Sequence, residues 1–155
     1  MIGGNKMNKN EFIKKVDEKI KLIRNERSFT QDKMAEILGI SKKTLLQVEK
    51  HRGTLGWTTT VAVCTIFKDS EILQLAFGGD PREIILSLAF TNYQEKYGRT
   101  FGGKVWWKDI KILGKYKIQQ NIISQHYRIL DGADRRICYS FEISYIYARL
   151  EELNK

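Results

Sequence analysis

The chain has 155 residues, 42% of them hydrophobic, and 27 basic against 18 acidic side chains give it a formal net charge of +9. This length fits one medium domain or two small ones, and the hydrophobic content excludes a disordered chain. The positive charge favours a polyanionic partner, with nucleic acid first and an anionic membrane surface second. The longest mostly apolar run, 57–67, is too short to span a bilayer and no signal core precedes it, so we expect a cytoplasmic protein without a membrane partner.

A first short helix is predicted after Thr30, whose hydroxyl is placed to cap it. Gly39 should end this helix, because the sharp turn that follows needs a residue that tolerates positive φ. Three apolar residues at helical spacing form its inward face: Met34, Ala35 and Leu38.

A second short helix is predicted after Ser41, which can cap it. Leu45 and Val48 point inward at i and i+3. The residues left to face outward are mostly basic or polar: Lys42, Lys43, Thr44, Leu46, Gln47 and Lys50. A helix with this outer face fits the major groove of DNA.

These residues resemble the lambda-repressor-like helix-turn-helix family, also called the Cro/C1 or XRE type. The resemblance rests on the opening Gln31, the small Ala35 where two helices cross, the turn 39–41, and the closing Glu49. Apolar stripes on both sides extend it over about residues 10–78. It implies a five-helix domain over residues 1–78 that binds double-stranded DNA.

The same resemblance implies which residues contact DNA. Gln31 would brace the backbone, while Gln47 or Lys43 would lie on base edges, because glutamine can pair with adenine and lysine with guanine. The full expected set is Gln31, Ser41, Lys42, Lys43, Thr44, Gln47, Lys50 and Arg52. Two positions depart from the family pattern: His51 replaces the usual glycine after the recognition helix, and Leu55-Gly56 replaces the usual proline before the fourth helix.

The clearest break in the chain is Gly78-Gly79-Asp80-Pro81, which we interpret as the end of the first domain. A connecting helix is predicted within residues 79–98, capped by Asp80 and running to about Tyr97. It is apolar on more than one side, which suggests burial against the C-terminal domain or against a second subunit.

The remaining residues, 99–155, change to an alternating pattern after the glycines at 98 and 102–103. Strands are predicted over 115–119, 127–130 and 136–141, with a turn at 131–134, followed by a helix over about 142–153. A three-stranded antiparallel sheet with one helix is the simplest architecture, with Trp106 and Trp107 before it. The whole chain is therefore predicted to be α+β.

Two roles for this second domain stay open. Between residues 99 and 136 there are nine basic and three acidic side chains. Sheets capped by a helix read the major groove in the arm-binding domains of some phage integrases and in plant AP2-type domains, so a second DNA contact is one reading. The other is a solvated basic face on a domain for oligomerisation or partner binding.

Little in the sequence indicates an enzyme or a metal protein. The two cysteines, Cys64 and Cys138, and the two histidines, His51 and His126, form no ligand set with metal-site spacing. His126 and nearby arginines resemble in type the residues of RNA-cleaving toxins, but no carboxylate is placed to orient the histidine.

The sequence thus predicts a bacterial or phage transcriptional regulator, a repressor acting as a homodimer, without catalytic residues or cofactor. An antitoxin-type autoregulator that binds a partner protein through its C-terminal domain is the nearest alternative. An RNA-cleaving enzyme of the toxin type is a more distant one.

Overall fold

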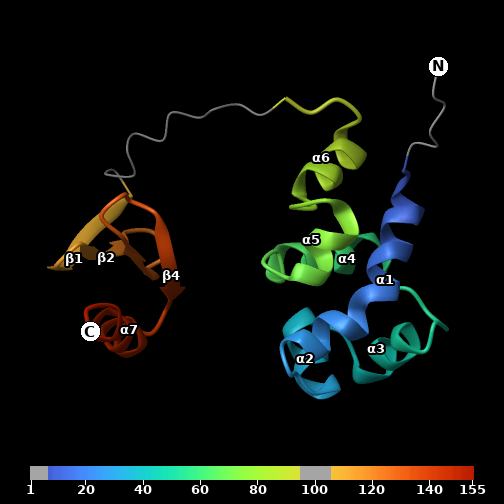
Figure 1. Cartoon of the computed structure of the whole chain (residues 1–155), viewed down its shortest axis with the longest axis horizontal. Coiled ribbons are helices and arrows are strands. Elements are labelled where there is room, and N and C mark those ends of the chain that lie inside the picture. The colour runs from blue at the N-terminus through green and yellow to red at the C-terminus, as the bar shows by residue number, and fades with distance from the viewer. Residues whose placement is uncertain (1–6, 95–105) are drawn as a thin grey trace. The chain divides into compact units, whose positions relative to one another are not determined.

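The computed structural model describes residues 7–94 and 106–155. The chain divides into two compact units, Met1–Glu95 and Lys96–Lys155, and each is described by itself. The first is helical and the second combines a sheet with one helix (Figure 1), which confirms the α+β class. Across the described ranges, no helix is both long and apolar enough to cross a membrane.

Six helices form the described part of the first unit: the five expected of its domain and the connecting helix, which was expected to lie outside it. Their bounds are α1 Lys9–Glu26, α2 Gln31–Leu38, α3 Lys42–Glu49, α4 Gly56–Ile66, α5 Glu71–Phe77 and α6 Arg82–Phe90. The segment 78–81, where the sequence suggested a domain end, joins α5 to α6 within this unit. The sixth helix belongs here because Ile84, Ile85 and Leu88 pack against the same core as the other five.

The long helix α1 organises this core. Asn8 caps it by accepting a hydrogen bond from the Glu11 N–H. Phe12, Val16, Ile20 and Ile23 recur at intervals of three or four residues and are completely buried, so one stripe of α1 contacts the other helices.

The connecting helix is shorter than the sequence predicted. It was expected to reach about Tyr97, but α6 ends at Phe90 and Thr91 adopts a φ of 62°. A threonine in this left-handed conformation breaks the helical hydrogen-bond pattern, which local apolar content cannot reveal. The predicted glycine break at 98 and 102–103 lies outside the described residues.

The second unit contains a four-stranded antiparallel sheet, so the expectation of three strands was wrong. The strands β1 Trp107–Leu113, β2 Tyr116–Asn121, β3 Tyr127–Leu130 and β4 Arg136–Ser140 follow one another in the order β1-β2-β3-β4. The additional strand is β1, at the edge, and Trp107 begins it instead of preceding the sheet. The predicted turn at 131–134 is confirmed by the hydrogen bond from the Asp134 N–H to the Asp131 carbonyl.

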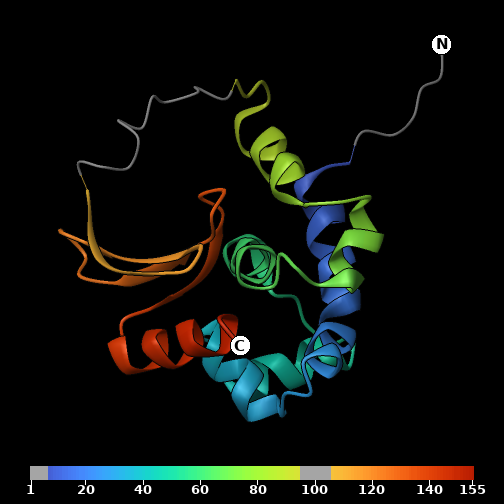
Figure 2. The same cartoon turned by 60° about the vertical axis from the view of Figure 1, so that its left-hand side comes forward.

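The last helix, α7 Ile143–Leu153, lies against one face of this sheet (Figure 2). Its Ile146 and Leu150 pack with Ile118 of β2 and Ile129 of β3, and all four side chains are buried. Because side chains alternate along a strand, the residues next to these two isoleucines lie on the opposite face.

Candidate nucleic-acid interface

The turn between α2 and α3 is built around Gly39. This residue has a φ of 69°, and its N–H donates to the Glu36 carbonyl while the Ile40 N–H donates to the Ala35 carbonyl. These two bonds satisfy carbonyls that would otherwise be free at the end of α2. The tight turn sends α3 across α2, with Thr30 capping α2 through the Lys33 N–H as predicted.

Ser41 begins α3 as the sequence predicted. Its hydroxyl accepts a hydrogen bond from the Thr44 N–H at 3.0 Å and shares a second one with the Thr44 hydroxyl at 2.8 Å. A cap of this kind contributes about 1 kcal/mol to helix stability. The first turn of α3 also carries the positive end of the helix dipole, which favours an anion near these residues.

The side chains of α3 divide as expected, except that Leu46 and Gln47, which were expected to face outward, are half-buried. Leu45 and Val48 are buried in the core of the first unit. Within the expected DNA-contacting set, the residues in and next to α3 other than Gln47 are exposed. They are Ser41, Lys42, Lys43, Thr44, Lys50 and Arg52. One continuous outward surface therefore carries hydroxyl, amide and cationic groups.

Lys42 is partly neutralised within the protein. Its Nζ lies 2.9 Å from Asp32 Oδ2 on α2, and both side chains are largely exposed. An exposed pair of this kind contributes at most about 1 kcal/mol, so a phosphate can replace the aspartate as its partner. For Lys43 and Lys50, by contrast, no ion pair occurs among the described residues.

A buried polar network holds α3 against α1 and α2. Arg24 Nε donates to Glu49 Oε1 at 2.6 Å, and its Nη1 donates to the Phe29 carbonyl at 3.0 Å. Gln31 Nε2 donates to Glu49 Oε2 at 2.7 Å. The Glu49 side chain is only 4% exposed, so both of its oxygens are satisfied inside the protein. The last turn of α3 is therefore anchored to α1 and α2, and this fixes the position of the helix.

This network changes the role of Gln31. The sequence placed it at the DNA backbone, and in the structure one of the two N–H groups of its amide is directed to Glu49. The second N–H of the same nitrogen is the group that would donate to a phosphate. Arg24 was not among the expected site residues. Its partner Glu49 was part of the sequence pattern, but only the structure shows that this carboxylate is buried and therefore needs a cationic partner.

The loop after α3 contains His51 and leads to Leu55-Gly56, the two places where the sequence departs from the helix-turn-helix pattern that it resembles. His51 adopts a φ of 58°, the left-handed conformation that glycine would take more readily. Gly53 then passes so close to Gln47 that an added Cβ would lie 3.2 Å from the Gln47 Cβ. The loop ends where the Leu55 N–H donates to Asp17 Oδ1 of α1, at 2.9 Å. Burial raises the pKa of the Asp17 carboxyl despite this bond.

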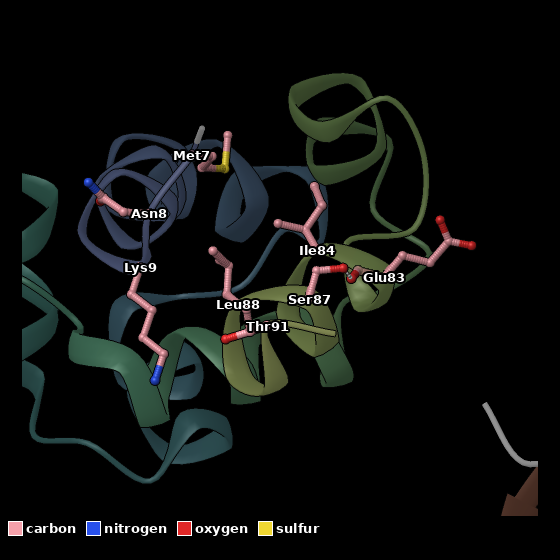
Figure 3. A pocket seen from close by; sticks show the side chains of 8 residues that line it. All are labelled: Met7, Asn8, Lys9, Glu83, Ile84, Ser87, Leu88 and Thr91. Atoms are coloured by element: carbon pink, nitrogen blue, oxygen red, sulfur yellow. Dashed lines mark hydrogen bonds between the residues drawn. The ribbon is translucent and has the colours of Figure 1, made fainter. Parts of the chain in front are cut away.

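A separate groove of about 730 Å³ lies between the first turn of α1 and α6 (Figure 3). Its lining is mixed in polarity, with Met7, Asn8, Lys9, Glu83, Ile84, Ser87, Leu88 and Thr91. The apolar Ile84 and Leu88 project from α6 toward α1, while Lys9 and Glu83 lie at the margins (Figure 3). None of the expected DNA-contacting residues lines it. No group of three metal-ligating side chains occurs in the ranges that the structure describes.

Comparisons with known proteins do not assign the chain to a group. No family model matches it, and neither the curated proteins nor the solved structures contain a significant match.

Proposed function

We propose that the protein is a sequence-specific DNA-binding transcriptional regulator whose α3 reads the major groove. The observation that carries this proposal is the division of α3, with Leu45 and Val48 in the core while Lys42, Lys43 and Thr44 are exposed on its first turns. An exposed cationic helix alone would be an ordinary solvated surface. Here the buried network around Glu49 and the glycine turn fix that helix rigidly, as reading base edges requires.

The proposed contacts separate into positioning and reading. Phosphates would be bound by the lysines, Arg52, the Ser41 hydroxyl and the free N–H of Gln31. These contacts set the position of the protein on the duplex but do not distinguish one base sequence from another. Gln47 and Lys43 would contact base edges. Gln47 lies beside Gly53, where the loop passes too close to its Cβ for a larger residue to fit without a shift. Occupancy of the site would then block or recruit polymerase, and repression is the simpler outcome.

A homodimer completes this proposal. Phe90 at the end of α6 is 60% exposed and contacts Tyr93, with the two rings tilted by 32° and 5.4 Å between ring centroids. An exposed aromatic pair of this kind favours an interface. A dimer would place two copies of α3 about 34 Å apart, one turn of DNA, and would select a near-palindromic site.

The test is a competition between a selected duplex and a scrambled duplex of the same composition, with Lys43→Ala and Gln47→Ala compared with Lys68→Ala. Lys68 is an exposed cation on the turn after α4, outside the proposed surface. Loss of one base contact should reduce discrimination by about 1–3 kcal/mol, while the Lys68 variant should keep it. Equal discrimination in all three variants would refute the assignment of α3.

A further inference from the structure

Within residues 106–155, no helix covers one face of the sheet. α7 covers the face that contains Ile118 and Ile129, so the alternate residues form the opposite surface, which we call the open face. Two cross-strand rows define its centre. The first row contains Asp109, Gln119, Arg128 and Tyr139. The second row contains Ile112, Lys117, Leu130 and Arg136.

The first row is connected by hydrogen bonds across three strands. Gln119 Nε2 donates to Asp109 Oδ1 at 2.7 Å. Gln119 Oε1 accepts from Arg128 Nε at 3.0 Å and from Nη2 at 2.8 Å. The Trp107 ring lies against the same guanidinium, 3.7 Å from ring centroid to Cζ. Polar groups in the centre of the open face are therefore held in one orientation.

Arg128 is a buried cation with only neutral direct partners. It is 8% exposed, and no carboxylate forms an ion pair with it in the part of the chain that the structure describes. Its Nη1 donates no hydrogen bond there. Burial, followed by the charge of Arg136, lowers the pKa of its guanidinium. A charge in such surroundings is costly unless a ligand supplies the missing anion.

The surroundings of Arg128 add cationic and apolar groups. Lys117 and Arg136 extend the positive charge across the second row, and Lys117 has only a long contact of 3.7 Å with the exposed Asp134. Tyr139 and Ile112 project from the two edges and are 54% and 66% exposed. A surface that combines fixed donors, cations and exposed apolar groups complements the edges and phosphates of a nucleic acid.

We propose that the open face is a second DNA-binding surface, which enters the major groove of a duplex. Neighbouring strands lie about 4.8 Å apart, so β2, β3 and β4, which contain Lys117, Arg128 and Arg136, together span about 10 Å between outer strands and fit a groove about 12 Å wide, with the edge strand β1 outside it. Lys117 and Arg136 then reach phosphates, while the exposed Tyr139 and the Nη1 of Arg128 face base edges, and the buried Gln119 holds the guanidinium in place. This surface lies beyond the proposed role of α3 and does not depend on it.

Duplex DNA fits better than a single strand. Single-stranded nucleic acids bind where aromatic rings offer free faces for stacking. The Trp107 ring is already stacked by Arg128 on one face and contacts His126 edge to face at a centroid distance of 4.9 Å. Tyr139 is then the one exposed ring in the two rows, which is too few for a stacking platform. Its contribution is to hold the guanidinium, and polar groups occupy the centre of the surface.

The first test compares Lys117→Ala/Arg136→Ala with Lys108→Ala in the full chain. Lys108 lies on β1 in register with Gln120, so it projects from the face that α7 covers. The probe is a labelled mixed-sequence duplex of about 40 base pairs. The double variant should bind about tenfold more weakly at 0.1 M salt, with a salt slope smaller by about 2, and the Lys108 variant should be unchanged. Equal binding and equal slopes in the two variants would overturn the proposal.

A second test uses a photoreactive benzoylphenylalanine in place of Tyr139. The same substitution at Tyr145, which is similarly exposed on α7, is the control. Crosslinking of the duplex from position 139 alone is the expected result. Crosslinking only to single-stranded DNA, to RNA or to a second copy of the chain would overturn it, as would an equal yield at position 145.

The same assays separate this inference from the proposed function. In a Lys42→Ala/Lys43→Ala background, the crosslink at position 139 should persist, because the two surfaces bind DNA independently. If that background binds as the parent does while the sheet variant is defective, the role of α3 fails and the open face stands. If only the α3 variant is defective, the open face fails.

Discussion

The Arg24 guanidinium of α1 binds the Glu49 carboxylate at the end of α3, with Nε 2.6 Å from Oε1. Both side chains are largely buried, and Gln31 binds the other carboxylate oxygen. This contact links the helix that organises the core to the helix proposed to read DNA. Its loss should therefore affect both stability and recognition.

Arg24→Met should lower the free energy of unfolding by about 3–5 kcal/mol, because Glu49 would keep a buried charge without its cation. The double variant Arg24→Met/Glu49→Met should lose less free energy of unfolding than the two single variants lose in sum. Urea unfolding followed by the helical circular dichroism signal measures this coupling. Strictly additive losses would show that the pair does not act as a unit.

Gly39 should tolerate asparagine better than valine. Its φ of 69° is the conformation that asparagine adopts most readily among residues with a Cβ, and no atom within 4 Å would contact an added Cβ. Gly39→Asn should cost about 1 kcal/mol or less and Gly39→Val about 2 kcal/mol or more. Thermal unfolding distinguishes them, and equal midpoints would argue against the strain account of this turn.

Local chemistry made much of the first unit predictable. The caps at Thr30 and Ser41 and the turn at Gly39 depend only on backbone groups within a few residues. The structure places all three as the sequence predicted. The pairing of Arg24 with Glu49 joins residues 25 positions apart, which no local pattern reports. His51 was expected to be a departure from the pattern that the sequence resembles, and only the structure shows that it adopts a φ of 58°, a conformation that glycine takes more readily.

The missed strand β1 has a similar explanation. Its register shifts between Asp109 and Lys111, so Ile110, Ile112 and Leu113 do not alternate as a regular strand would. As an edge strand it also leaves Ile112 exposed. The residues Gly114 and Lys115 between β1 and β2 were the available signal, because a short glycine-containing connection between apolar runs indicates a hairpin.

The proposed dimer predicts a specific effect of charge at Phe90. Phe90→Lys should shift the full chain from dimer to monomer at micromolar concentration, because a buried lysine would be unpaired at the interface. Leu75→Lys is the control, since Leu75 is an even more exposed apolar residue of the same unit. Light scattering measures the mass. A monomeric parent, or equal masses for both variants, would remove α6 from the interface.

Cys64 should make the first unit sensitive to alkali. Burial, followed by the charge of Asp80, raises the pKa of this thiol from 9.0 to about 12. Above pH 9 the unfolded chain therefore releases a proton that the folded chain retains, and stability falls as pH rises. Between about pH 8 and pH 10 this thiol should account for about 1 kcal/mol of the loss.

Over this pH interval, the free energy of unfolding of Cys64→Ala should therefore fall by about 1 kcal/mol less than that of the parent. Near neutral pH the variant is less stable than the parent. Unfolding in urea at the two pH values gives the comparison. Cys138→Ala, in the second unit, should leave the transition of the first unit unchanged. A parent and a Cys64 variant with equal alkaline losses would contradict this assignment.

The most direct measurement of the central claim is selection of bound duplexes from a random pool by the full chain, repeated with Lys43→Ala/Gln47→Ala. The account predicts that the parent enriches a defined near-palindromic sequence and that the variant loses or changes the enriched bases while still binding DNA through phosphates. A parent that enriches no sequence, or a variant that enriches the same one, would contradict it.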